Sequence, residues 1–157
     1  MNETVFARIK KWLDENKIEY REIHHEPTYS SKASAEARGE SMKIGGKALV
    51  MKIENEFKIF VISAERKMDS RKIKTFFNAK RTRFAFEDEL KELTGVVPGA
   101  VPPFGRPIID LDLYVDRSIT KNERIAFNAG SLTDSIIMKT EDYLRITKPQ
   151  IIDFSKE

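Results

Sequence analysis

The chain of 157 residues has no cysteine, and its longest apolar runs, such as 57–64, are only as long as a strand. Without cysteine there can be no disulfide bond and no thiolate catalysis. A membrane-spanning helix needs about 20 consecutive apolar residues. The first residues also lack the basic and apolar regions of a signal peptide. We therefore expect a cytoplasmic protein that forms one domain over residues 1–157, a usual size for a single core.

Histidine is also scarce, because the sequence contains only His24 and His25. Successive side chains of a strand point to opposite faces, so two adjacent histidines do not easily share one metal ion. The common signatures of phosphate-binding loops, dinucleotide-binding glycines and nucleophile elbows are absent as well. We therefore expect no metal ion and no cofactor.

The apolar residues that are present predict an α+β fold, with a mixed, mostly antiparallel sheet of about six or seven strands surrounded by helices. Helical spacing and capping residues, among them Asp69 and Thr140, mark several helices, and Phe76 is expected to face inward from one of them. The predicted helices are 3–17, 28–38, 69–77, 87–93 and 140–145. The predicted strands are 20–24, 47–53, 57–63, 81–86, 108–115, 123–127 and 135–139, with an edge segment at 151–154.

The most distinctive segment is 94–105. It holds three glycines and half of the six prolines, and it has no charged residue in a chain that is 34% charged. Proline restrains φ and has no N–H, whereas glycine allows positive φ and close approach of the backbone. Their alternation predicts an irregular but stiff loop whose amides can point at a ligand.

Positive charge is concentrated in segment 66–83, which has eight Lys or Arg residues and one acid, although the net charge of the chain is only +3. A basic surface of this kind can neutralise phosphates. Lys and Arg are also common on the solvated face of a helix, and charge alone favours that interpretation.

Three polar residues stand at the ends of predicted strands. Lys47 opens an apolar strand, where its ammonium can meet a phosphate or carboxylate or can simply extend into water. Asp116 follows a strand and suits either ligand binding or a cap, and Asn128 begins an Asn-Ala-Gly segment that suits a hairpin turn.

Taken in order, these landmarks resemble the YbaK/prolyl-tRNA-synthetase-associated editing family of aminoacyl-tRNA deacylases. No single landmark is specific, but together they extend over nearly the whole chain. The resemblance implies a mixed sheet with helices, no metal or cofactor, and hydrolysis of the ester that joins a wrong amino acid to the 3′ end of a tRNA. The matching segments are 25–28 (His-Glu-Pro-Thr) with the helix after it, 47–50 (Lys-Ala-Leu-Val), 69–73 (Asp-Ser-Arg-Lys-Ile), 94–105, Asp116 and 127–130 (Phe-Asn-Ala-Gly).

The resemblance also implies roles for single residues. A signature lysine of the family holds the terminal adenosine or its phosphate, and the backbone of a Gly-x-x-x-Pro loop lies against the ester. The residues expected to be catalytic are Lys47, Gly95, Gly99, Ala100 and Val101. Those expected to bind or brace the substrate are His25, Thr28, Ser31, Pro103, Phe104, Asp116, Asn128 and Gly130. Those expected to contact tRNA phosphates are Arg66, Lys67, Arg71, Lys72, Lys80 and Arg81.

An aminoacyl ester is already activated, so its hydrolysis needs no strong protein nucleophile. Fixed amides can stabilise the oxyanion, and positioning can direct a water or the neighbouring ribose hydroxyl. Ala48 stands where several relatives carry threonine or asparagine, and this departure bears on pocket size. A small amino acid such as Cys, Ala or Ser is expected, with Cys-tRNA(Pro) and Ala-tRNA(Pro) as the leading substrates.

The predicted partner is the 3′ acceptor end of an aminoacyl-tRNA, with an aminoacyl-tRNA synthetase as a further partner and no membrane. The sequence does not indicate an oligomeric state. Two other functions stay open at this point. One is a non-catalytic module that binds an aminoacyl-tRNA or a nucleotide and docks on a synthetase. The other is an RNA-binding domain that uses segment 66–83 alone.

Overall fold

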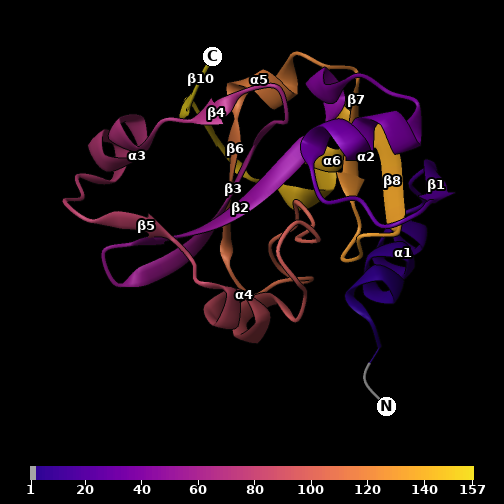
Figure 1. Cartoon of the computed structure of the whole chain (residues 1–157), viewed down its shortest axis with the longest axis horizontal. Helices are drawn as coiled ribbons and strands as arrows, with labels where there is room; N and C mark the ends of the chain where they lie inside the picture. The colour runs from indigo at the N-terminus through magenta and orange to yellow at the C-terminus, as the bar shows by residue number, and fades with distance from the viewer. Residues whose placement is uncertain (1–2) are drawn as a thin grey trace.

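The computed structural model describes residues 3–157 (Figure 1). The described chain forms six α-helices and one short 3-10 helix, η1 (Met42–Ile44). The α-helices are α1 (Val5–Glu15), α2 (Ser31–Arg38), α3 (Ser70–Phe77), α4 (Glu87–Thr94), α5 (Arg117–Thr120) and α6 (Thr140–Thr147). No helix within residues 3–157 is both long and apolar enough to cross a membrane.

Ten strands form three sheets within the described residues. The strands are β1 (Tyr20–His24), β2 (Gly46–Ile53), β3 (Glu56–Ser63), β4 (Lys67–Met68), β5 (Thr82–Phe84), β6 (Asp112–Asp116), β7 (Arg124–Asn128), β8 (Asp134–Lys139), β9 (Gln150–Ile152) and β10 (Ser155–Lys156). The sheet orders are β5-β2-β3-β6-β9, β1-β8-β7 and β10-β4. Among the strand pairs within residues 3–157, only β3–β6 and β6–β9 are parallel. The predicted fold class, α+β with mostly antiparallel pairing, is confirmed, although the strands are more numerous than expected.

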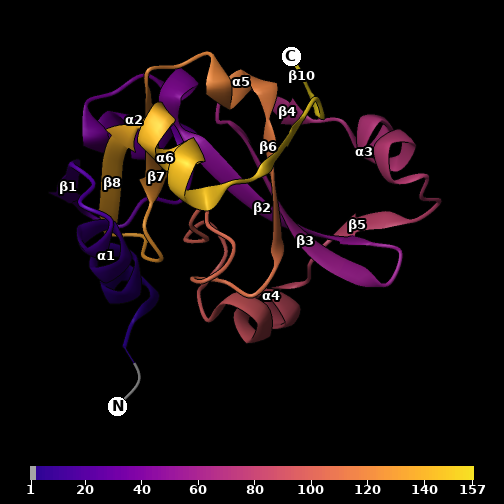
Figure 2. The same ribbon diagram turned by 180° about the vertical axis from the view of Figure 1, so that it is seen from behind.

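The β2–β3 hairpin crosses the middle of the molecule in both views (Figures 1 and 2). Helix α2 covers one face of the β7–β8 pair and α6 covers the other. A parallel bridge between Gly45 and Ala126 brings the start of the hairpin to β7. The first residues of β2 therefore lie where the hairpin, α2 and the three-stranded sheet meet.

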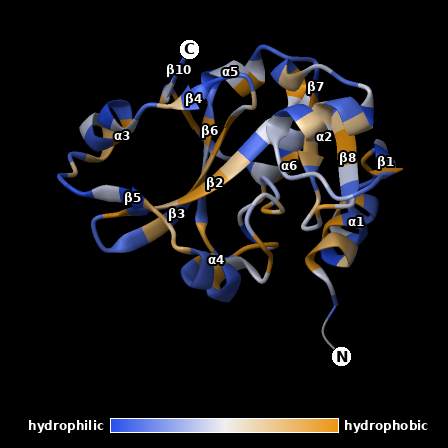
Figure 3. Ribbon diagram, viewed as in Figure 1, coloured by the Kyte–Doolittle hydropathy of each residue, from blue (hydrophilic) through white to orange (hydrophobic). Residues whose placement is uncertain are grey.

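Strand β3 is buried on both faces, and its side chains alternate between two hydrophobic clusters. Ile59 and Val61 belong to the larger cluster, with α1 and the three-stranded sheet, whereas Phe60 and Ile62 pack with α3 and the C-terminal segment. The colouring by hydropathy shows apolar residues gathered in the central strands and polar ones on α4 and the hairpin tip (Figure 3). Burial on both faces explains why the sequence of β3 is an almost continuous apolar run rather than an alternating one.

Local signals located most helix ends. Asp69 accepts a hydrogen bond from the Arg71 amide and caps α3 as predicted, and α4 ends at Gly95 in the left-handed conformation. Thr140 was expected to cap α6, but Lys139 holds that position, and the buried Thr140 hydroxyl has no hydrogen-bond partner among the described residues. Phe76 was expected to face inward, and it is 44% exposed.

The strand predicted over 108–115 begins only at Asp112. Residues 105–109 form a turn instead, in which the amides of Ile108 and Ile109 both donate to the Gly105 carbonyl at 2.9 Å. Both isoleucines are buried, so their apolar pattern matches that of a strand although the backbone turns.

Candidate active site

The first residues of β2 form one wall of a cavity of about 200 Å³. The segment before α2, the inner face of α2, the loop around Gly99 and the end of β7 supply the other walls. Among the residues expected from the sequence, the cavity brings together Thr28, Ser31, Lys47, Gly99, Val101 and Asn128.

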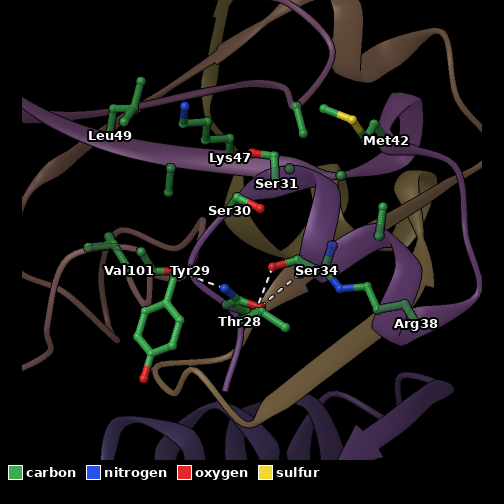
Figure 4. Close-up of a pocket in the computed structure, with 17 residues that line it drawn as sticks. Thr28, Tyr29, Ser30, Ser31, Ser34, Arg38, Met42, Lys47, Leu49 and Val101 are labelled. Atoms are coloured by element: carbon green, nitrogen blue, oxygen red, sulfur yellow. Dashed lines mark hydrogen bonds between the residues drawn. The ribbon is translucent and has the colours of Figure 1, made fainter. Parts of the chain in front are cut away.

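Helix α2 presents a polar stripe to this cavity. Ser31, Ser34 and Arg38 stand at i, i+3 and i+7, which places them on one helix face. The buried hydroxyls of Ser34 and Thr28 lie 2.8 Å apart, and Figure 4 shows them facing each other, with Arg38 extending from the same helix. Ser34 and Arg38 were not singled out from the sequence. The i, i+3, i+7 spacing was a signal that could have found them.

Arg38 is half-buried, and it forms no ion pair with any carboxylate among residues 3–157. Its Nε donates to the Ser135 Oγ at 2.9 Å, and one terminal nitrogen donates to the Asn128 Oδ1 at 2.9 Å. Burial lowers the pKa of the Arg38 guanidinium to about 10. The group therefore keeps its charge at neutral pH, and the cavity wall holds a cation without a counterion, which favours an anionic ligand or a developing negative charge.

His25 was expected to line or brace the pocket, and it braces it from outside the cavity wall. Its Nδ1 lies 2.8 Å from the Glu26 carbonyl oxygen, which can only accept, so Nδ1 carries the proton. In the neutral ring, Nε2 then accepts from the Ser135 hydroxyl at 2.9 Å. That orientation turns the lone pairs of the Ser135 oxygen toward Arg38.

The predicted stiff loop is built on a turn. The Ala100 amide donates to the Val97 carbonyl at 3.1 Å, and Gly99 has a φ of 86°. Proline at the second position and a positive-φ glycine at the third are the signature of a type II turn. Asn128 then fastens the turn to β7, because its Nδ2 donates to the Gly99 carbonyl at 2.8 Å.

The loop amides are not equivalent. The Ala100 amide already donates within the turn. The Gly95 amide donates to the Lys91 carbonyl at 2.8 Å, and Gly95 lies outside the cavity. The expectation that these two amides face the substrate is therefore wrong. Within residues 3–157, the amides of Gly99 and Val101 donate no hydrogen bond. Both residues line the cavity, so an oxygen of a ligand bound there can accept from these amides.

Lys47 lies on the rim of the cavity, where its side chain is exposed. It takes part in no hydrogen bond or ion pair of its side chain with any described residue. Lys47 and Leu49 project from the same side of β2, as residues two apart in a strand do (Figure 4). The ammonium is thus free to meet a ligand at the mouth of the cavity.

Four residues expected at the substrate lie elsewhere. Phe104 is fully buried against Trp12, Phe127 and Tyr143. The Pro103 carbonyl accepts from the Tyr143 hydroxyl at 2.6 Å. Gly130 packs on α1, since a Cβ there would lie 2.9 Å from that of Val5.

Asp116 is the fourth of these residues. It is buried away from the cavity, and its carboxylate accepts from the Ser118 amide, the Phe154 amide and the Ser155 hydroxyl at 2.7–3.0 Å. Burial opposes ionisation, but these hydrogen bonds outweigh it and lower the pKa of Asp116. Of the two roles open from the sequence, the structure thus supports the cap.

The residues expected to contact tRNA are divided between separate surfaces. Arg66 and Lys72 line a second cavity, while Lys80 and Arg81 lie beside Glu54 at the tip of the β2–β3 hairpin. Lys67 belongs to β4 and Arg71 to α3. In the part of the chain that the structure describes, no three His, Asp or Glu side chains form a group that could hold a metal ion.

The chain is similar to known tRNA-editing proteins. A family model described as the aminoacyl-tRNA editing domain matches residues 25–146. The Multifunctional Ser/Thr-tRNA deacylase ProXp-y of Escherichia coli (strain K12) is 34% identical over 155 residues, which covers 95% of this chain and 92% of the relative. A Proline--tRNA ligase of Macrococcus caseolyticus is 24% identical over 128 residues, 82% of this chain but only 22% of the ligase. A solved structure reported as a candidate trans-editing enzyme for prolyl tRNA synthetase has a TM-score of 0.82 at 22% identity, with all of both chains covered, and shows the shared fold.

Proposed function

Because the chain belongs to the aminoacyl-tRNA editing domain family, we propose that residues 1–157 act as one trans-editing deacylase that removes a wrong amino acid from the 3′ end of a tRNA. The observation that carries this proposal is the cavity between α2, β2 and the Gly99 turn. It combines an uncompensated Arg38 with two amides that lack partners, at Gly99 and Val101. These are the groups that a tetrahedral oxyanion needs.

The reaction follows from these groups. A water, which the free hydroxyl of the terminal ribose can orient, attacks the ester carbonyl carbon, and the carbonyl oxygen becomes an oxyanion. We assign its stabilisation to the amides of Gly99 and Val101 and to the charge of Arg38. The carbon–oxygen bond to the ribose then breaks, and the departing ribose oxygen takes up the proton released by the attacking water. The products after water attack are the free amino acid and the uncharged tRNA.

Lys47 is the residue we assign to the tRNA end. At the cavity mouth, its free ammonium can hold the phosphate of the terminal nucleotide, while the ester reaches into the cavity. This anchoring positions the reacting carbonyl against the turn, and positioning of this kind contributes much of the rate in such reactions.

For the amino acid, we infer that serine and threonine fit the cavity better than alanine and cysteine. The buried hydroxyls of Thr28 and Ser34 form a hydrogen-bonded pair, and Ser30 and Ser31 add two more hydroxyls to the lining. A site that hydrogen-bonds a substrate hydroxyl strongly disfavours an analogue without one. The name of the Escherichia coli relative, which specifies Ser/Thr-tRNA, supports this choice. Cys-tRNA(Pro) and Ala-tRNA(Pro), the substrates expected from the sequence, stay in the test panel.

The experiment follows ester loss from tRNA(Pro) charged with serine, threonine, alanine or cysteine. We expect hydrolysis by the wild type, fastest with serine and threonine, and a loss of about 100-fold in Lys47→Ala. If no species is hydrolysed, the deacylase proposal fails and a binding module becomes the better description. Wild-type rates in Lys47→Ala would contradict the role of the lysine alone.

A synthetase is the partner that we propose to deliver the tRNA. The Proline--tRNA ligase relative carries a matching segment within a much longer protein, which supports this idea. If delivery is needed, hydrolysis by the isolated chain will be strong at low salt and will collapse near physiological salt, and a cognate synthetase will restore it. Rates that do not depend on salt would argue against a delivering partner.

A further inference from the structure

A second cavity, of about 310 Å³, lies on the other side of η1 from the candidate active site. The two cavities share a wall: Met42 and Ala64 line the first, and their chain neighbours Lys43 and Ser63 line the second. We propose that this second cavity binds backbone phosphates of the RNA strand whose 3′ end occupies the first. The proposal rests on the proposed function for the identity of that strand.

The charge of the second cavity supports an anionic ligand. Five cationic and three acidic residues line it. Two of the acids are already satisfied, because Asp116 accepts three hydrogen bonds from the protein and Asp153 pairs with Lys72 at 3.2 Å. Glu65 is exposed on the rim. The remaining cations, Lys43, Arg66, Arg117 and Lys121, form no ion pair within residues 3–157.

The form of the site favours a polymer over a small anion. Lys43, Arg117 and Lys121 come from two separate elements and are exposed. A single exposed cation gains little from one small anion in water, because both are well hydrated. On a nucleic acid strand, the contacts to successive phosphates add together and release condensed counterions. Several exposed cations beside the active-site wall are therefore better suited to a strand than to a metabolite.

The sequence singled out a different surface for this role. Of the six residues expected to contact tRNA, only Arg66 and Lys72 lie in the second cavity. Lys43, Arg117 and Lys121 stand far from segment 66–83 in the sequence and join these two only in the folded chain. The inferred phosphate site is thus formed by cations from three parts of the chain and not by the continuous basic tract 66–83.

The test removes three of these charges with Lys43→Ala, Arg117→Ala and Lys121→Ala in one variant. All three side chains are exposed and donate no hydrogen bond to a described residue, so the fold should survive. The control, Lys17→Asn with Lys91→Ala and Lys139→Ala, removes the same charge from exposed positions elsewhere. A third variant, Arg71→Ala with Lys80→Ala and Arg81→Ala, removes cations of the predicted tract that lie outside the cavity.

The probe is a labelled RNA hairpin that has a single-stranded CCA 3′ end and carries no amino acid. Its binding is followed by fluorescence anisotropy at several salt concentrations. We expect the cavity variant to bind about tenfold more weakly or worse. The slope of log K against log salt should fall by about two units, at about 0.7 for each lost contact to a single strand. We expect the charge control to keep the wild-type slope.

Two results would overturn the inference. One is an unchanged slope in the cavity variant, including the case in which the site binds only inorganic phosphate in a separate titration. The other is a loss in the control or in the 71/80/81 variant as large as that in the cavity variant. Because the hairpin carries no ester, these outcomes are independent of whether the protein hydrolyses any charged tRNA, and failure of the proposed function is seen separately.

Discussion

The Asn128 Nδ2 donates to the Gly99 carbonyl oxygen at 2.8 Å and thereby ties the Gly99 turn to the end of β7. The Oδ1 of the same amide accepts from Arg38 at 2.9 Å. Only the nitrogen can donate and only the oxygen can accept, so the two partners together determine the amide orientation. One side chain therefore couples the cation of α2 to the turn that carries the free amides.

Removing this bond should slow hydrolysis more than it weakens binding. In Asn128→Ala the turn loses its anchor, and a displacement of about 1 Å at a reacting group can cost about 100-fold in rate. Asn128→Asp keeps an acceptor for Arg38 but sets a carboxylate against the Gly99 carbonyl. We expect kcat to fall in both variants, with little change in KM, in single-turnover and steady-state assays. A wild-type kcat in Asn128→Asp would show that the Gly99 bond does not matter.

Replacing Arg38 should separate activity from stability. Arg38→Met keeps much of the volume and removes a half-buried cation that has no carboxylate partner within residues 3–157. Burying such a charge is unfavourable, so we expect an unchanged or higher Tm. The value of kcat/KM should fall about 100-fold, the usual loss for one oxyanion donor.

Arg38→Lys is the matched comparison. Lysine keeps the charge but cannot make the two fork-like hydrogen bonds to Ser135 and Asn128. We expect an intermediate activity from this variant. If Arg38→Met were fully active, or if its Tm fell by many degrees, the residue would have a structural role rather than a role in the reaction.

The hydroxyl of Thr28 should determine the preference for serine and threonine. Thr28→Val is nearly the same size and removes one member of the Thr28–Ser34 pair. We expect kcat/KM for seryl- and threonyl-tRNA to fall by about 10-fold to 100-fold relative to alanyl-tRNA, because a buried hydrogen bond is lost. Thr28→Ser keeps the hydroxyl and should keep the preference. An unchanged ratio in Thr28→Val would place the selection elsewhere.

Asp116 should matter for stability, in a pH-dependent way. Asp116→Asn keeps one acceptor oxygen, so it loses either the hydrogen bond from the Phe154 amide to Oδ1 or the bonds from the Ser118 amide and the Ser155 hydroxyl to Oδ2. We expect a loss of about 2–3 kcal/mol in the free energy of unfolding at pH 7. The hydrogen bonds lower the pKa of Asp116 in the folded protein below its ordinary value. Its contribution is therefore complete above the ordinary pKa of about 4 and disappears as the pH falls through the lowered one.

Urea denaturation of Asp116→Asn and the wild type at neutral and acidic pH measures this effect. The difference between the two proteins should be largest near pH 7 and should shrink below about pH 4. A constant difference over that range would mean that the ionised carboxylate is not what stabilises the C-terminal segment.

Local residue patterns were sufficient for most elements and failed where one pattern has two structural meanings. Helix α3 with its Asp69 cap and strand β1 were predicted within one residue of their observed bounds. Ile108 and Ile109 were assigned to a strand because they are apolar. In the structure they are buried within a turn and do not pair with a strand. Thr140 is a good capping residue by type, but its neighbour took that position and left its hydroxyl buried.

In the candidate site, residues of unusual type for their place were visible in the sequence, and residues of ordinary type were not. Lys47 and Asn128 stood out at strand ends, and both lie at the cavity. Gly95 belongs to the same glycine-rich segment as Gly99, but it ends a helix instead. Arg38 is an ordinary residue for the last turn of a helix, so only its surroundings in the fold distinguish it.

The residue types of segment 94–105 are enough to predict a stiff loop with a backbone that can bind a ligand, because proline fixes φ and removes an N–H donor, and glycine allows positive φ. Which amides of this loop stay free, and which cations lie beside them, depends on how the distant elements pack together. An amide stays free when no carbonyl oxygen packs within hydrogen-bonding distance of it. A charge stays uncompensated when no carboxylate packs beside it. Arg38, Asn128 and Gly99 meet only after α2, β7 and the loop have packed, and no local pattern contains that contact.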